Sequence, residues 1–85
     1  MNKHTIRAIQ ARVDYYELAL KLGYRNPNDV YRIAIGDVAY DFHYGHLELE
    51  PFIIAYPKFN DVAYTVGVVR DGKFIPDVEP ERRSK

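Results

Sequence analysis

The stretch LALKLGYRNPNDVYRIAIGD, from Leu18 to Asp37, decides the fold, because it is compatible with two different structures. In the first, a helix ends near Gly23 and a second helix begins at Pro27. In the second, the helix is followed by a strand that turns back at Gly36-Asp37. Each structure places the polar side chains of the stretch on a different kind of surface, so the choice also affects the expected function.

A helix over residues 5–22 is predicted by apolar side chains three and four positions apart, which gather on one helical face. These residues are Ile6, Ile9, Val13, Tyr16 and Leu20. Asp14 and Glu17 form a D-x-x-E capping arrangement, so the segment is either one helix or two that meet near Asp14. Gly23 is the expected end, since glycine adopts the left-handed conformation that terminates many helices.

A second helix from Pro27 is predicted by three local signals. Asn26 is a preferred N-cap, Pro27 suits the first helical position, and Asp29 places a negative charge in the first turn. This helix ends at Gly36 or continues to residue 44.

The alternative is a hairpin. Val30 to Ile35 is β-branched and aromatic, and Gly36-Asp37 suits a two-residue turn. Its register sets Arg32 opposite Asp41, Ile33 opposite Tyr40 and Tyr31 opposite Phe42. We favour the helix, because the hairpin gives no role to Asn26-Pro27-x-Asp29, whereas the helix costs well under ~1 kcal/mol per residue in propensity.

Beyond Gly45 the apolar pattern changes to period two, which predicts an antiparallel meander over residues 47–78. Residues 47–50 alternate, residues 52–56 form an apolar run, residues 58–61 suit a loop, and residues 62–69 are apolar on both faces. Asp71-Gly72 is a favoured hairpin turn that sets Val69 opposite Phe74 and Val68 opposite Ile75. Pro76 places the last strand at an edge of the sheet, and the polar residues 79–85 suit a frayed tail.

The predicted fold is α+β, with two N-terminal helices (5–22, and 27–36 or 27–44) followed by a three-stranded antiparallel β-meander packed on them. Eighty-five residues suit a single domain, 1–85, and the apolar content of 47% is ample for a core. The sequence has no cysteine and no apolar run long enough to span a bilayer. We therefore expect a folded cytoplasmic protein without disulfides.

The formal net charge is zero, but the charge is unevenly spread. Residues 1–32 carry six Lys and Arg side chains against three Asp and Glu, a net charge of +3. Residues 33–69 carry one basic side chain against five acidic ones, a net charge of −4. A basic first segment favours an anionic partner there.

Ala19, Gly23, Val30 and Ile33 resemble the core and turn positions of a helix-turn-helix, and Tyr24, Arg25 and Pro27 resemble a LexA-type turn. The resemblance covers residues 18–36. It implies a small non-enzymatic DNA-binding regulator of transcription, a homodimer that reads two half-sites of double-stranded DNA. The residues that it places at the DNA are Arg25, Asn26, Asn28, Tyr31, Arg32, Lys21 and Arg12.

The alternative function is a protein-binding module or inhibitor, including one that mimics nucleic acid. Eight tyrosines exceed what a small core encloses with their hydroxyls satisfied, so some are expected at the surface. The candidate surface lies in residues 37–50, where aromatic and acidic residues interleave. Its members are Tyr40, Asp41, Phe42, Tyr44, Glu48 and Glu50.

His43 and His46 are the remaining candidates for chemistry. Their H-x-x-H spacing crosses the glycine turn that we expect at Gly45, and no third histidine lies nearby in the sequence. We expect no metal site and no cofactor. The chain has no phosphate-binding loop, nucleophile motif or paired catalytic carboxylates, so we do not expect an enzyme.

Overall fold

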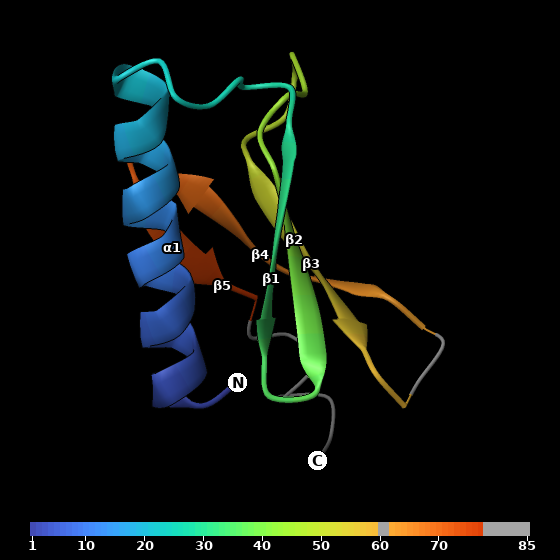
Figure 1. The fold of residues 1–85 in the computed structure, drawn as a ribbon. Helices are drawn as coiled ribbons and strands as arrows, with labels where there is room; N and C mark the ends of the chain where they lie inside the picture. The colour runs from blue at the N-terminus through green and yellow to red at the C-terminus, as the bar shows by residue number, and fades with distance from the viewer. Residues whose placement is uncertain (60–61, 78–85) are drawn as a thin grey trace.

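The computed structural model describes residues 1–59 and 62–77, which form one helix and one antiparallel sheet (Figure 1). The helix α1 spans Lys3–Lys21. The five strands are β1 (Val30–Ile35), β2 (Val38–His43), β3 (Phe52–Pro57), β4 (Tyr64–Arg70) and β5 (Lys73–Pro76). They pair in sequence order, β1-β2-β3-β4-β5.

The predicted fold class is therefore wrong. The described residues contain one helix instead of two, and five strands instead of three. Neither the helix 27–36 nor the longer helix 27–44 is present, because these residues form the β1–β2 hairpin. The fold is mostly β.

The first helix is confirmed and is a single piece through Asp14. Its N-cap is Asn2, whose side chain accepts a hydrogen bond from the Thr5 backbone at 2.8 Å. Gly23 ends the helix with a φ of +81°, as predicted. The buried side of α1 consists of Ile9, Val13, Tyr16 and Ala19.

The β1–β2 hairpin has the register of the alternative that we rejected, with Arg32 opposite Asp41 and Tyr31 opposite Phe42. Gly36 has a φ of +63°, whereas Asp37 has no positive φ, a combination typical of a type II′ turn. Asn26 caps no helix; its side chain accepts from the backbone of Asn28 at 2.8 Å and so closes a local turn.

Strands β3, β4 and β5 pair consecutively, but they belong to a five-stranded sheet and do not form the separate three-stranded meander that we expected. Strand β3 begins only at Phe52, and residues 47–49 form a turn and bend. The predicted register at Asp71-Gly72 is correct, with Val69 opposite Phe74 and Val68 opposite Ile75. Both turn residues have a positive φ, as a type I′ turn requires. Pro76 lies on the edge strand β5, and the tail 79–85 lies outside the described residues.

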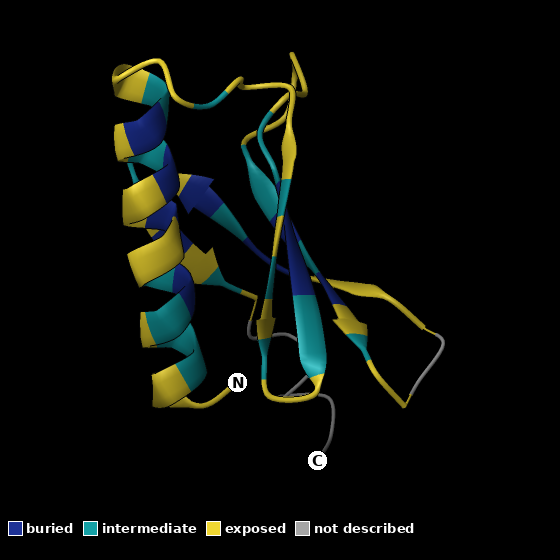
Figure 2. Ribbon diagram, in the orientation of Figure 1, coloured by how far each residue is buried: buried dark blue, intermediate teal, exposed yellow. Residues whose placement is uncertain are grey.

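The core lies between α1 and one face of the sheet (Figure 2). Ile9 and Val13 of α1 pack there with buried side chains from all strands except β1. Figure 1 shows β4 and β5 behind the helix, while β1, β2 and β3 stand beside it. Strand β1 contributes partly buried side chains to this core, namely Tyr31, Ile33 and Ile35.

Candidate interaction surface

The two edges of the sheet differ in how their backbone groups are satisfied. At β5, the side chain of Gln10 accepts from the Phe74 N–H at 2.8 Å and donates to the Gly72 carbonyl at 2.9 Å. Pro76, near the end of the same strand, has no N–H to leave unpaired. The β5 edge is therefore largely closed by the protein itself.

The β1 edge is open. Because the hairpin loop has two residues, Ile35 exchanges both backbone hydrogen bonds with Val38, and Ile33 does so with Tyr40. The N–H and C=O groups of Arg32 and Ala34 therefore point away from β2. Within residues 1–59 and 62–77 no hydrogen bond reaches this outer side of β1. Such an edge is a template for a further strand.

Beside this edge lies an arginine–tyrosine cluster, which we define as Arg12, Tyr15, Arg25 and Tyr31. Arg12 Nη1 donates to the Tyr31 hydroxyl at 3.2 Å, and the guanidinium carbon of Arg25 lies 4.5 Å from the centre of the Tyr31 ring. Tyr15 is 54% exposed, with its ring centre 6.2 Å from that of Tyr31. The cluster thus holds two cations against one aromatic side chain of β1.

Tyr16, on the buried side of α1, supports the cluster through contacts with Tyr31 and with the loop between α1 and β1. Its ring stacks on Tyr31 with centres 5.5 Å apart, and its hydroxyl donates to the Asn26 carbonyl at 3.0 Å. Burial raises the pKa of Tyr16, and the carboxylate of Asp29 adds to this effect. The Tyr16 hydroxyl also lies 3.4 Å from the Asp29 carbonyl, so it holds the loop between α1 and β1 to the helix, while Arg25 and Asp29, 4.0 Å apart, form an ion pair within that loop.

The structure brings together only three of the residues expected at DNA, namely Arg12, Arg25 and Tyr31. Asn26 and Asn28 bond to each other within their loop. Residues 30–35, expected within the second helix of the helix-turn-helix, are a strand. Sequence reasoning missed Tyr15 as a member of the cluster. The available signal was its position three residues after Arg12, which places the two side chains side by side on the predicted helix.

Arg32 lies on the opposite face of the sheet from the cluster, because side chains alternate along β1. Its Nε and Nη2 donate to the two carboxylate oxygens of Asp41 at 2.5 and 2.9 Å. Its guanidinium also lies 5.1 Å from the centre of the Tyr56 ring. Hydrogen bonding to Asp41 raises the pKa of Arg32. Asp41 is only 5% exposed, so the guanidinium of Arg32 is used to neutralise this buried carboxylate on the neighbouring strand.

The segment 37–50 does not form the exposed aromatic and acidic surface that the alternative function required. Tyr40, Asp41 and Phe42 are buried. The Tyr44 hydroxyl is buried beside Glu17, and both burial and that carboxylate raise the pKa of Tyr44. Glu48 is exposed. Glu50 accepts from Arg70 at 2.6 and 2.9 Å, and this bonding lowers the pKa of Glu50.

The two histidines border a hollow of about 250 Å³ beside the loop between α1 and β1. His43 stacks face to face on Phe52, with ring centres 5.0 Å apart, and His46 lies 5.9 Å from His43. In the described part of the chain, no three His, Asp, Glu or Cys side chains converge on one point. The expected lack of metal, cofactor and catalysis stays a prediction.

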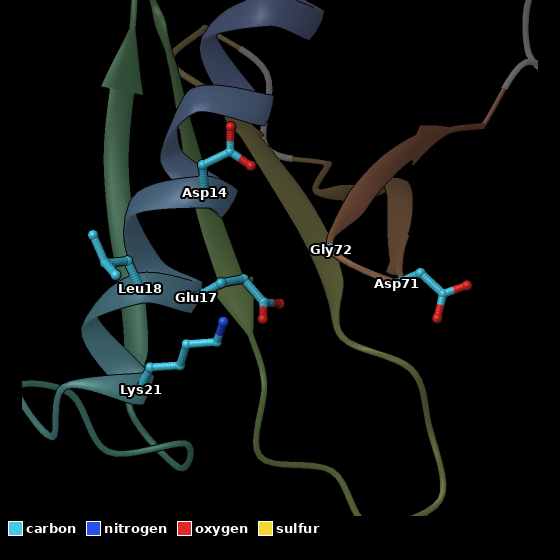
Figure 3. A pocket seen from close by; sticks show the side chains of 6 residues that line it. All are labelled: Asp14, Glu17, Leu18, Lys21, Asp71 and Gly72. Atoms are coloured by element: carbon cyan, nitrogen blue, oxygen red, sulfur yellow. The ribbon is translucent and has the colours of Figure 1, made fainter.

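A second hollow, of about 490 Å³, separates α1 from the turn between β4 and β5 (Figure 3). It is open and is lined by Asp14, Glu17, Leu18, Lys21, Asp71 and Gly72. Figure 3 shows Lys21, another expected DNA contact, on the side of α1 that faces Asp71, whereas Leu18 points away from it. Lys21 therefore lies apart from the arginine–tyrosine cluster and among carboxylates.

Among the described residues, no helix combines the length and the apolar character needed to cross a membrane. No protein-family model, curated protein or solved structure matches the chain.

Proposed function

We propose that this chain is a small non-enzymatic protein-binding module that takes an extended, acidic segment of a partner along β1. The observation that carries the proposal is the open outer edge of β1, next to two arginines, in a sheet whose other edge is closed. An intracellular location, expected from the lack of cysteine, belongs to the same proposal.

An added strand would obtain its affinity from the main chain and its specificity from side chains on both faces. On the helix side it would meet Ile33 and Ile35, which are only partly buried by the protein's own core. On the other side it would meet Ala34, a small side chain that leaves room for a larger one. Both sides of the edge thus accept a partner side chain.

The acidic character of the segment follows from the arginine–tyrosine cluster. Arg12 is exposed and, within the described part of the chain, makes one hydrogen bond, to a neutral tyrosine hydroxyl. Arg25 has Asp29 beside it only at 4.0 Å, beyond hydrogen-bond length. Both guanidinium groups retain donors for a carboxylate. Their aromatic neighbours Tyr15 and Tyr31 match the Tyr and Arg composition of interface hot spots.

The test is selection from a random library of displayed linear peptides, followed by fluorescence anisotropy with the enriched sequences. We expect acidic residues beside alternating apolar ones. Ala34→Pro removes an outward N–H without touching the β1–β2 hydrogen bonds, so it should weaken binding by about tenfold or more. Ala34→Thr keeps the N–H and is the matched control. Enriched peptides that bind Ala34→Pro normally would contradict the proposal.

Binding of nucleic acid is the second candidate, favoured by the same cluster. Stacked tyrosines beside arginines resemble a base-stacking platform with cations for the phosphates. Single-stranded and duplex DNA at low salt are the probes. If nucleic acid is the ligand, Arg12→Gln and Arg25→Gln should each weaken binding and flatten its salt dependence, while Ala34→Pro leaves it unchanged. The strand-addition proposal predicts the reverse for Ala34→Pro.

A further inference from the structure

The outer face of α1 carries a second apolar stripe that the core does not use. Its large members are Tyr15, Leu18 and Leu22, which are 54%, 54% and 60% exposed. Ala11 continues the stripe one turn earlier and is also exposed. An amphipathic surface helix normally has one apolar face, toward its core. A second face of this kind is typical of a helix with a further partner.

The stripe has the spacing of a helix–helix seam. Ala11, Tyr15, Leu18 and Leu22 follow at steps of four, three and four, the alternation of the two core positions in a heptad repeat. The buried side of α1 starts at Ile9 and lies on a different face. The seam therefore adds to the core contact and does not compete with it.

The two flanks of the seam differ in charge. One flank carries Asp14 and Lys21, seven residues apart, and Figure 3 shows both on the side of α1 that faces Asp71. The other flank carries Arg12 and the small Ala19. Between Ala11 and Leu22 this flank thus holds one charge of each sign, and Arg7 continues it seven residues before Asp14.

This arrangement is self-complementary in one orientation. When two copies of α1 pair antiparallel about a two-fold axis, Tyr15 meets Leu18 of the second copy and Ala11 meets Leu22. On the flank, Asp14 then meets Lys21 of the second copy, and this contact occurs twice by symmetry. A parallel pair would instead set Arg7 against Arg12 of the second copy, a like-charge contact. The charges therefore select the antiparallel pair.

We infer that two copies of this chain associate through their α1 helices, packed antiparallel along Ala11, Tyr15, Leu18 and Leu22. The inference does not rest on the proposed function, because it leaves the backbone groups of the outer edge of β1 free; the two surfaces share Tyr15, which also belongs to the arginine–tyrosine cluster. It also differs from a dimer built through β1, which would bury that edge.

The first test is sedimentation equilibrium of the whole chain across a hundredfold range of concentration. We expect a reversible monomer–dimer equilibrium. Leu18→Glu should weaken the dimer by about tenfold or more, since it places a charge at the centre of the seam. Leu47→Glu is the matched control, because Leu47 is fully exposed and lies outside the helix. A wild-type chain that stays monomeric throughout the range would overturn the inference.

The second test exchanges the flanking charges. Asp14→Lys and Lys21→Asp each create a like-charge contact across the antiparallel pair, so each alone should weaken the dimer. The double variant restores opposite charges and should regain most of the affinity. Circular dichroism checks that each variant is folded, because Asp14 also accepts from Gln10. If the double variant is no better than the singles, the antiparallel arrangement is wrong.

Ala34→Pro separates this inference from the proposed function. It should leave the dimer intact while it weakens peptide binding. A dimer that Ala34→Pro disrupts would use β1 and would overturn the inference.

Discussion

Gln10 and Phe74 lie 64 positions apart in the sequence, yet the Gln10 side chain bonds to the Phe74 backbone as a neighbouring strand would. Its amide oxygen takes the outward N–H of Phe74, and its amide nitrogen donates to the carbonyl of Gly72. One side chain of α1 therefore closes the β5 edge and fixes the position of the helix on the sheet. This leaves β1 as the open edge.

Gln10→Leu should lower the free energy of unfolding by about 1–3 kcal/mol, because the Phe74 N–H would be left without a partner in a partly buried place. Urea denaturation followed by circular dichroism measures the change. Arg7→Ala, at an exposed position of the same helix, should change little. Equal stability of Gln10→Leu and the wild type would show that water satisfies the β5 edge equally well.

Gly67→Ala should be among the most destabilising small substitutions in the chain. A Cβ at Gly67 would overlap the Ile75 carbonyl oxygen and would lie 2.7 Å from Phe74 Cε1 and 3.0 Å from Pro76 Cα. Relief requires β4 and β5 to separate, at a cost of about 1–3 kcal/mol or more. Gly72→Ala is the control, since its Cβ meets nothing within 4 Å and only its φ of +77° is unfavourable. Thermal unfolding should rank Gly67→Ala well below Gly72→Ala.

The elements predicted correctly are those with consistent local signals. The helix follows from apolar spacing on one face and from Gly23, and the β4–β5 hairpin follows from Asp71-Gly72 between alternating residues. In both, the residues that end the element have a single conformational role. The edge position of Pro76 follows in the same way from its missing N–H.

The β1–β2 hairpin was rejected because Asn26, Pro27 and Asp29 suit the start of a helix. The same residues also suit a turn, and here Asn26 accepts from Asn28 while Asp29 donates its backbone N–H to the Asn26 carbonyl. Local signals could not separate these roles. The strand is favoured over the helix by contacts between residues far apart in the sequence, because Tyr31 and Ile33 pack against the core formed by α1 and the other strands. The cluster of Arg12, Arg25 and Tyr31 depends on the same contacts and could not be assembled from the sequence.

Arg32→Met should destabilise the protein, because it leaves the carboxylate of Asp41 almost buried and without its cation. Asp41→Leu in the same chain removes that carboxylate. The double variant should therefore recover much of the loss, and chemical denaturation of the four proteins in the cycle measures the recovery. A double variant less stable than Arg32→Met would show that Asp41 is stabilised by groups other than Arg32.

The stability of the protein should fall at alkaline pH, with Tyr44 as a main cause. Burial and the neighbouring Glu17 carboxylate raise the pKa of Tyr44 in the folded state above the value of about 10 found in unfolded chains. The folded state therefore retains a proton that the unfolded state loses. The stabilisation is complete below about pH 10 and is lost progressively as the pH rises above it.

Tyr44→Phe removes the titrating group and should flatten this loss by at most about 1.4 kcal/mol per pH unit. Some slope should remain, because burial also raises the pKa values of Tyr16 and Tyr40. At neutral pH the substitution should cost little, since the buried Tyr44 hydroxyl makes no hydrogen bond of ordinary geometry among the described residues, although the Glu17 carboxylate lies beside it. The measurement is urea denaturation at a series of pH values, with Tyr24→Phe as the control at a position 81% exposed. If Tyr44→Phe loses stability above pH 10 as steeply as Tyr24→Phe does, the alkaline transition belongs to other groups.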